Sequence, residues 1–167
     1  MKRLIIAACA AALIPMSACT KDFDNSTVDE FDLTRYLGGW YEIARYDNVF
    51  QRGLIDVTAR YSLLPDNTIK VINRGVNPRG KVKKIIGTAF QPSSLKPGQL
   101  RVSFFFWFAS DYNIIMLAPD YSYSVVSGHN GKMLWILARK RFLDSATLDH
   151  IFEFLRTRGH NPSKLIF

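Results

Sequence analysis

The sequence offers few side chains that could act as a nucleophile, a general base or a metal ligand. Its two thiols, Cys9 and Cys19, lie in or at the end of an N-terminal apolar run, so a domain after that run has no cysteine pair for a disulfide or a zinc site. The G-x-S-x-G, H-E-x-x-H, P-loop and G-x-G-x-x-G motifs are absent. The sequence has three histidines without the spacing of a metal site: His129, His150 and His160. These residues predict no catalytic site, no metal site and no cofactor.

The N-terminus has the pattern of a targeting segment. Lys2 and Arg3 precede an unbroken apolar run that is too short to span a membrane. The run ends at the letters MSAC, residues 16–19, which resemble a bacterial lipobox, in which the cysteine is lipidated and becomes the first residue of the mature protein. We therefore expect a lipoprotein signal peptide at 1–18 and a membrane anchor on Cys19. An ordinary signal peptide is the alternative.

Composition and charge narrow the class of protein. With 167 residues, 48% of them hydrophobic, the chain is long and apolar enough to fold as one domain. Its net charge of +8 leaves nucleic acid, anionic lipid and small acidic ligands open as partners. An exported, lipid-anchored protein has little access to chromosomal DNA, so we predict no nucleic-acid partner. Thr20, rather than Asp, follows Cys19, and by resemblance to sorted lipoproteins this favours the outer membrane, facing the periplasm.

A tether connects the predicted anchor to the predicted domain. The stretch from Thr20 to Asp32 holds five acidic residues, one lysine and no apolar period. Such a composition is typical of a linker. We therefore assign residues 19–32 to a lipidated tether and residues 33–167 to a single domain.

From Trp40 onward, apolar and polar residues alternate in short runs, the pattern of an all-β domain. The runs between these strands have turn composition, including Ala109-Ser110-Asp111. Short connections predict antiparallel neighbours in an up-and-down meander, which closes into a barrel or packs as a sandwich. The predicted strands span residues 40–47, 55–63, 69–75, 82–90, 99–106, 112–118, 122–127 and 133–139.

One segment near the C-terminus has a helical period instead. Asp144 or Ser145 is its predicted N-cap, and Gly159 is its predicted end. We expect an amphipathic helix packed on the outside of the sheet, followed by a short closing strand at 165–167. The apolar residues at i, i+3, i+4 and i+7 are Leu148, Ile151, Phe152 and Leu155.

Three blocks resemble the sequence motifs of the lipocalins. The first contains the G-x-W of the family as Gly38-Gly39-Trp40, just before the first strand. The second, Pro119-Asp120-Tyr121, stands where lipocalins carry T-D-Y, and the third, WILAR, supplies Arg139. With the runs FQRG, NRGVNP and VSFF, the chain is similar to the bacterial lipocalins, relatives of apolipoprotein D, from Phe31 to Phe167. The resemblance implies an all-β, eight-stranded antiparallel barrel, or calyx, with one C-terminal helix outside.

The resemblance also implies that the residues of these blocks determine the fold rather than contact a ligand. Trp40 opens the first strand and Arg139 ends the eighth, so they become neighbours only if the barrel closes. A guanidinium plane over an indole would then close the floor of the barrel. Pro119 in place of Thr removes one hydroxyl from the second motif. The predicted structural residues are Gly38, Trp40, Asp120, Tyr121 and Arg139.

Strand parity assigns the side chains that face the interior. If Arg139 points into the floor, alternate residues before it share its side, and polarity selects the inward face of the other strands. On strand 112–118 the two faces are almost equally apolar, and the choice between them stays open. The predicted inward faces of their strands also include Leu100, Ile114, Tyr121 and Val125. The predicted ligand contacts are Met133, Trp135, Leu137, Val102, Phe104, Phe106, Tyr112, Met116, Tyr123 and Arg74, the last of which lies just below a mouth loop.

The end of the barrel opposite the G-x-W block is the expected mouth, surrounded by loops 47–53, 75–81, 106–111 and 128–132. These loops carry more cationic than acidic residues, because only Asp47 and Asp111 oppose the cations. A cationic rim suits an amphiphile with a phosphate or carboxylate at the entrance. An ordinary solvated basic surface is the alternative. The predicted rim residues are Arg52, Arg79, Lys81 and Lys132.

We expect a carrier rather than an enzyme. The resemblance implies binding of fatty acids or lysophospholipids in the calyx, for lipid storage or transport in envelope maintenance. One alternative is a weak lipid-modifying enzyme on the same scaffold, which turnover of a lysophospholipid would reveal. Another is a structural lipoprotein that forms a homodimer through Phe105, Trp107 and the outward strand faces, which concentration-dependent sedimentation would reveal.

Overall fold

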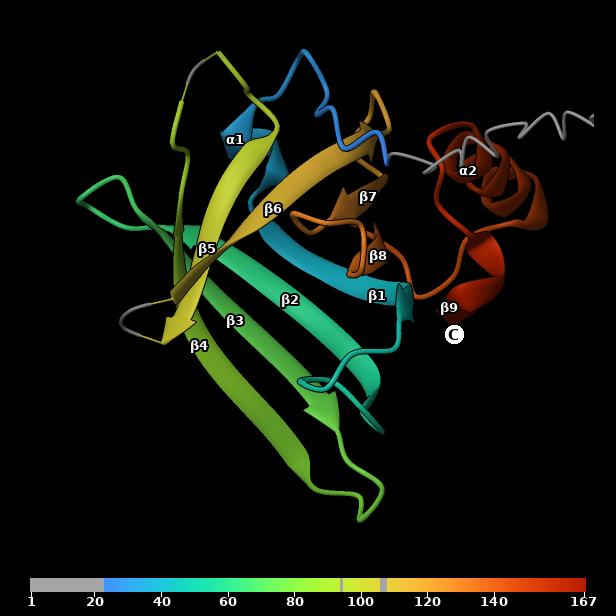
Figure 1. The fold of residues 1–167 in the computed structure, drawn as a ribbon. Helices are drawn as coiled ribbons and strands as arrows, with labels where there is room; N and C mark the ends of the chain where they lie inside the picture. The colour runs from blue at the N-terminus through green and yellow to red at the C-terminus, as the bar shows by residue number, and fades with distance from the viewer. Residues whose placement is uncertain (1–22, 94, 106–107) are drawn as a thin grey trace, which may run out of the picture.

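The computed structural model of the chain describes residues 23–93, 95–105 and 108–167 (Figure 1). The predicted signal peptide and Cys19 lie outside the described residues, as do Phe106 and Trp107. In these three ranges, no helix is long and apolar enough to cross a membrane.

Eight antiparallel strands form a closed barrel in the described part of the chain. Strand β1 pairs with β2 on one side and with β8 on the other, so the sheet closes on itself and the sandwich alternative is excluded. The strands are β1 (Gly38–Tyr46), β2 (Ile55–Leu63), β3 (Ile69–Val76), β4 (Val82–Phe90), β5 (Gln99–Phe105), β6 (Phe108–Leu117), β7 (Tyr123–Ser127) and β8 (Leu134–Ala138).

Strand β6 begins earlier than the sequence predicts. The predicted turn at 109–111 is wrong, because these residues pair with residues 101–103 of β5 across the hairpin. Their small side chains have turn composition, yet Asp111 forms an ion pair with Arg101 on the neighbouring strand at 3.2 Å. A cross-strand pair of opposite charges therefore stabilises strand structure where composition indicated a loop.

Helix α2 (Ser145–Thr157) packs against the outside of the barrel, as predicted. Asp144 is the N-cap, since its Oδ1 accepts a hydrogen bond from the Thr147 N–H at 2.8 Å. Gly159 follows the helix end with a φ of +80°, a conformation that favours glycine. Ile151 and Leu155 are fully buried against the outer faces of β7 and β8. After a 3₁₀ turn at Pro162–Lys164, the short strand β9 (Leu165–Ile166) pairs with the end of β1.

A short helix that the sequence did not predict, α1 (Leu33–Tyr36), lies at the closed end of the barrel. It begins at Asp32, whose Oδ1 accepts a hydrogen bond from the Thr34 N–H at 2.8 Å. Its last residue, Tyr36, is fully buried, and the Tyr36 carbonyl accepts a hydrogen bond from Trp40 Nε1 at 2.9 Å. Helix α1 thereby ties the chain before the first strand to the floor of the barrel.

Arg139 joins the two ends of the barrel sheet at this floor. Its guanidinium lies 3.8 Å from the centroid of the Trp40 ring, the cation–π contact that the lipocalin resemblance implies. The same guanidinium donates hydrogen bonds to the carbonyls of Gly39 at 2.8 Å and Arg35 at 2.7 Å. Gly38 has a φ of +96°, and a Cβ there would approach Arg139 Nη1 to 3.4 Å, so glycine suits both the backbone and the close approach.

The second motif block completes the closed end. Tyr121, with a φ of +62°, accepts a hydrogen bond on its hydroxyl from the Asp32 N–H at 2.7 Å and stacks under Arg35. The Asp120 carboxylate accepts from the Ser122 N–H at 3.0 Å and so holds the turn. The Pro119 carbonyl accepts from Arg35 Nη2 at 2.9 Å, so the block still joins α1 without a hydroxyl at this position.

We predict that the closed end dominates stability. Trp40→Ala should lower the free energy of unfolding by about 3–5 kcal/mol, because it empties a fully buried indole site. Arg139→Lys should cost about 2 kcal/mol, because lysine cannot stack on the ring and bond several carbonyls at once. Urea denaturation measures both values.

Arg141→Lys is the matched control, because Arg141 stacks on Tyr41 at 4.9 Å but has a mostly exposed side chain. It should change stability by less than about 0.5 kcal/mol. An Arg139→Lys variant as stable as Arg141→Lys would contradict the role assigned to Arg139.

Candidate ligand site

The interior of the barrel is one apolar cluster to which every barrel strand contributes. Phe104, Tyr112 and Trp135 are partly buried against this cluster and extend it. Such an interior, enclosed by a closed sheet with apolar walls, is the kind of space that holds either packed side chains or one small apolar ligand. Its buried members from the strands are Trp40, Tyr61, Ile69, Val71, Ala89, Leu100, Val102, Ile114, Val126 and Leu137.

Three tyrosine hydroxyls meet near the floor of this interior. The Tyr112 hydroxyl lies 2.8 Å from that of Tyr36 and 2.9 Å from that of Tyr61. The Tyr36 hydroxyl also donates to Ser124 Oγ at 3.4 Å. Burial raises the pKa of Tyr36 to about 12 and raises the pKa values of Tyr61 and Tyr112 as well. All three hydroxyls are therefore neutral at physiological pH and satisfy one another rather than water.

A second polar group lies nearer the open end, around a buried ion pair. Arg45 Nη1 lies 2.5 Å from Glu42 Oε1, and the two side chains are only 8% and 6% exposed. Gln51 Nε2 donates to the other Glu42 oxygen at 2.7 Å, and Trp135 Nε1 donates to Gln51 Oε1 at 2.7 Å. Burial raises the pKa of Glu42, although the hydrogen bonds from Arg45 and Gln51 oppose that shift. The indole predicted to contact a ligand is thus fixed by a polar network.

Sequence reasoning missed Glu42, Arg45 and Gln51. Glu42 could have been found by parity, because it lies two residues after Trp40 on the same face of β1. Arg45 could not, because the β1–β8 register shifts between Glu42 and Ala44, and this irregularity moves Arg45 to the face that an unbroken strand would give to Ala44. Ala44 packs on the outer face instead.

On two strands the predicted inward residues lie in the interior. On β5, Val102 is buried in the interior cluster and Phe104 packs against it. On β8, Leu137 and Trp135 point inward, while Leu134 and Ile136 pack under α2 as expected. Tyr112 also lies inside, which resolves the face of the first half of β6.

On β7 and in the second half of β6, the predicted inward residues lie on the outer face instead. Met116 packs in the cluster beneath α2, because the β6–β7 register shifts between Ile114 and Met116 and reverses the parity of β6. Tyr123 and Val125 also pack beneath α2, and Val126 faces the interior. Tyr121, used to set their parity, lies in a turn with positive φ before β7 begins.

Three further predicted contacts lie elsewhere. Arg74 is exposed and lies on the outer face of β3, since Val71, three residues before it, points inward. Met133 is half-buried just before β8, in a turn where its carbonyl accepts a hydrogen bond from the Gly128 N–H at 2.9 Å. Phe106 lies outside the described residues, so its contact stays a prediction.

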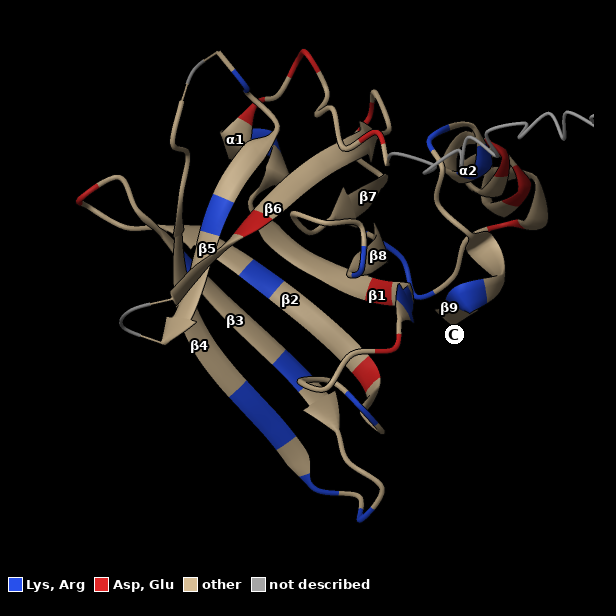
Figure 2. Cartoon of the chain, viewed as in Figure 1, with Lys and Arg blue, Asp and Glu red and all other residues tan. Residues whose placement is uncertain are grey.

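The predicted rim cations surround the open end on three connections. Arg52 pairs with Asp47 at 2.9 Å within the β1–β2 loop, so this charge is locally neutralised. Arg79 and Lys81 lie at the tip of the β3–β4 hairpin, where their N–H groups donate to Asn77 Oδ1 and their side chains are exposed. Lys132 is exposed in the β7–β8 loop. Figure 2 shows the cationic hairpin tip and continuing cations along β4.

The histidines do not meet in the described ranges. His129 pairs with Asp111 at 2.7 Å on the surface, and His160 is buried against Phe23. No group of three or more His, Cys, Asp or Glu side chains that could hold a metal ion occurs among the described residues.

Comparison with known proteins agrees with this architecture. The model of the lipocalin-like domain matches residues 31–167. Outer membrane lipoprotein Blc of Vibrio cholerae is 40% identical over 142 residues, covering 84% of this chain and 83% of that protein. The protein of the same name from Escherichia coli K12 is 38% identical over 171 residues, covering 100% of this chain and 97% of its own length.

A solved structure shows the same fold. Insecticyanin from the tobacco hornworm Manduca sexta superposes with a TM-score of 0.69 at 23% identity, over 84% of this chain and 82% of that one. The matched domain, the relatives and the closed barrel agree with the three motif blocks. The chain belongs to the lipocalin family.

Proposed function

We propose that this lipocalin is an outer-membrane-anchored carrier that binds one fatty acid or lysophospholipid in the barrel interior, for lipid storage or transport in envelope maintenance. The observation that carries the proposal is the apolar interior cluster from all eight barrel strands, with a polar network set beneath the open end. An acyl tail fits the apolar walls, and a polar head would remain near the open end.

The energetics favour an acyl ligand of moderate affinity. Burial of about ten methylenes contributes about 8 kcal/mol at about 0.8 kcal/mol each. Association opposes this with about 4–15 kcal/mol of lost freedom. Without that opposing cost, 8 kcal/mol corresponds to about micromolar affinity, so the tail alone binds more weakly than this and selection among lipids depends on the head group.

The buried ion pair directs the charge of that head group toward the rim. Glu42 already neutralises Arg45, whose Nη2 also donates to the carbonyls of Gln51 and Leu54 at 3.0 Å. Among the residues that the structure describes, an anionic head therefore finds no free cation at this depth and meets the exposed cations of the β3–β4 hairpin. The same pairing favours binding over catalysis, because the Glu42 carboxylate is fully engaged by Arg45 and Gln51.

Anchoring rests on the N-terminal motif and on the relatives. Both bacterial relatives are named outer membrane lipoproteins, and the Escherichia coli alignment covers the whole of this chain. Cys19 would carry the acyl chains after removal of residues 1–18. Thr20 after it favours the outer membrane.

Acyl binding should depend on interior and not on exterior side chains. Trp135→Ala should weaken binding of a fatty acid at least about tenfold, because it removes apolar contact and the donor to Gln51. Met116→Ala, a matched control beneath α2, should change affinity by less than about twofold. Fluorescent fatty-acid displacement measures both, and an equal loss in the two variants would show that the interior is not the site.

The anchor should depend on one residue. Cys19→Ser should yield a folded but unanchored protein, because the substitution removes every acyl chain. Fractionation of cells, with a high-salt wash of the membranes, measures how much of the variant stays with the membrane fraction. A variant that stays with the membrane fraction after the wash would contradict acylation of Cys19.

The rim should recognise an anionic head group. Arg79→Glu with Lys81→Glu should weaken lysophospholipid binding a few-fold at low salt and leave a fatty alcohol of equal chain length unaffected, because exposed pairs contribute about 0.2–1 kcal/mol each. The difference should vanish at high salt through screening. The turn itself survives, because Asn77 binds backbone N–H groups at both positions. Titration of both ligands at two salt concentrations is the measurement, and an equal change for both ligands would reduce the rim to a solvated surface.

A further inference from the structure

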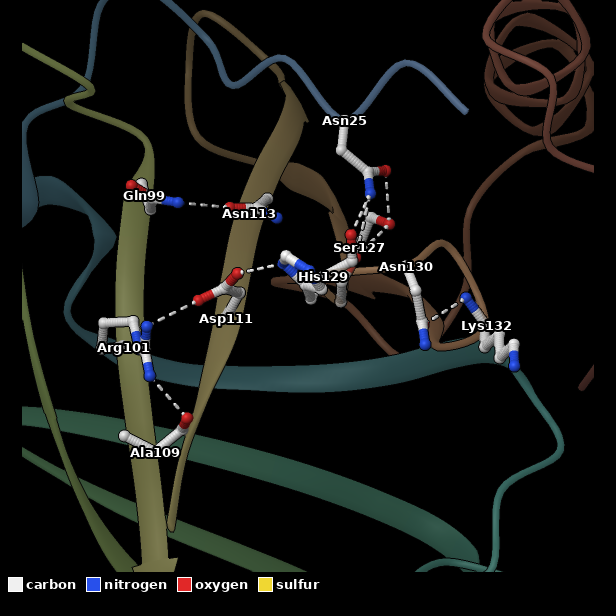
Figure 3. Close-up of polar contacts among 11 residues, drawn as sticks. Asn25, Gln99, Arg101, Ala109, Asp111, Asn113, Ser127, His129, Asn130 and Lys132 are labelled. Atoms are coloured by element: carbon white, nitrogen blue, oxygen red, sulfur yellow. Dashed lines mark hydrogen bonds and ion pairs between the residues drawn. The ribbon is translucent and has the colours of Figure 1, made fainter. Parts of the chain in front are cut away.

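The first described residues, 23–28, are fixed against the barrel, although their composition is that of a tether. Asn25 Nδ2 donates to the carbonyls of Gly128 and His129, both at 3.1 Å, and Asn25 Oδ1 accepts from Ser127 Oγ at 2.8 Å (Figure 3). The Val28 N–H donates to the Ile114 carbonyl at 2.9 Å. We call residues 23–28 the strap.

Helix α2 holds the strap from the other side. The Asp24 N–H donates to the Arg158 carbonyl at 3.1 Å, and Arg158 Nη1 donates to the Ser26 carbonyl at 2.6 Å. The carboxylate of Asp24 also lies 3.5 Å from Arg158 Nη1. The strap is therefore bonded to the end of β7 and to the end of α2 at once.

The strap starts beside the open end of the barrel. The Phe23 ring stacks on His160 with a centroid distance of 5.5 Å and covers Gly131, where a Cβ would come within 2.7 Å of the ring. Gly131 belongs to the β7–β8 loop, which lies at the open end. A surface pocket beside this ring is lined in part by Tyr46, Asp47 and Lys132, which end β1 or belong to open-end loops.

The position of Phe23 limits where an anchor can lie. Cys19 precedes Phe23 by four residues, and an extended chain spans at most about 3.6 Å per residue, so the two backbones are within about 14 Å of each other. A membrane that holds acyl chains on Cys19 must therefore approach the open end. This step rests on the anchor proposed above.

The exposed surface at the open end has the chemistry of a membrane contact. Large apolar side chains there are exposed instead of buried, including Phe50 at 74% and Phe108 at 70%. The sequence has no acidic residue between Asp66 and Asp111, and the cations of this stretch include Lys83 and Lys84 on β4 beside the hairpin tip. Other exposed apolar side chains at this end are Val49, Val82 and Phe105.

Acidic residues gather instead at the closed end. Asp29, Glu30 and Asp32 precede or cap α1, while Asp66 and Asp120 lie in the loops on the same side. Figure 2 shows acidic residues in the closed-end loops and cations along β4 and at the tip of the β3–β4 hairpin. Acidic residues of the open end lie on the β1–β2 side, where Asp47 pairs with Arg52 and Asp56 pairs with Arg141. An anionic lipid surface would thus attract the open end and repel the closed end.

We propose that the strap turns the open end of the barrel toward the membrane that holds the anchor, and that the apolar and cationic side chains of that end contact anionic lipid headgroups. A lipid then passes between bilayer and barrel interior without crossing bulk water. The strap acts as the orienting element, and the open-end surface acts as the contact.

The test places one environment-sensitive label at either end of the acylated mature protein, which begins at Cys19, in vesicles of phosphatidylethanolamine and phosphatidylglycerol. With Cys19 blocked by its lipid, Phe50→Cys labels the open end and Pro65→Cys labels the exposed β2–β3 loop at the closed end. We expect nitroxide-labelled lipids to quench the label at residue 50 at least threefold more than the label at residue 65. Equal quenching, or stronger quenching at residue 65, would overturn the orientation.

A variant of the strap tests whether the strap sets the orientation. Phe23→Ser with Asn25→Ala should reduce the difference between the two labels to less than about twofold, because the chain between anchor and barrel becomes free. Asp29→Ala, an exposed substitution farther along the same segment, should keep the full difference. An undiminished difference in the double variant would show that the strap does not set the orientation.

A second measurement separates the surface contact from the anchor. The Cys19→Ser chain with Lys83→Ala and Lys84→Ala should bind phosphatidylglycerol vesicles about twenty-fivefold more weakly than Cys19→Ser alone, because each lysine contributes about fivefold. Lys96→Ala, at the closed end, should have no effect. An equal loss of vesicle affinity for the substitutions at the two ends would overturn the surface contact. Mass spectrometry of the wild-type protein tests the anchor separately: a chain without acyl groups would contradict the proposed anchor and the orientation that depends on it.

Discussion

The contact of Arg139 with Trp40 is the interaction on which the rest of the structure depends. It joins the residue after the last barrel strand to the first strand, and its hydrogen bonds to the Gly39 and Arg35 carbonyls hold the chain that enters β1. A guanidinium can do this because its flat face stacks on the indole while its edge donates several hydrogen bonds in one plane. Closure at this point removes the free sheet edges and gives the barrel a floor.

Closure also explains how polar groups persist inside an apolar barrel. The tyrosine hydroxyls satisfy one another near the floor, and Glu42, Arg45, Gln51 and Trp135 form a chain of hydrogen bonds nearer the open end. Buried polar groups are tolerated when they are paired, and a paired network fixes the rotamers of its members. The interior is thus apolar along most of its walls and polar at two defined depths.

The molecule also has two chemically different ends. The closed end carries the acidic residues around α1, and the open end carries the cationic β3–β4 hairpin together with exposed aromatic side chains. The strap connects the N-terminal side of the domain to the open end through contacts with both β7 and α2. Positive charge, exposed apolar surface and the first residue of the strap, Phe23, therefore coincide at the open end of the barrel.

The sequence by itself determined the strand number, the outer helix with its Asp144 cap, the barrel closure implied by the motif blocks, and the interior placement of Val102, Phe104, Leu137 and Trp135. Alternating polarity and short turns suffice for these features because they depend on local pattern. Met116, Tyr123 and Arg45 were beyond its reach, because the register shifts in β1 and β6 and the positive φ of Tyr121 reverse the parity that a continuous strand would keep. The strap was equally hidden, since its partners Gly128, His129 and Arg158 lie more than one hundred residues away in the chain and meet it only once the barrel has closed.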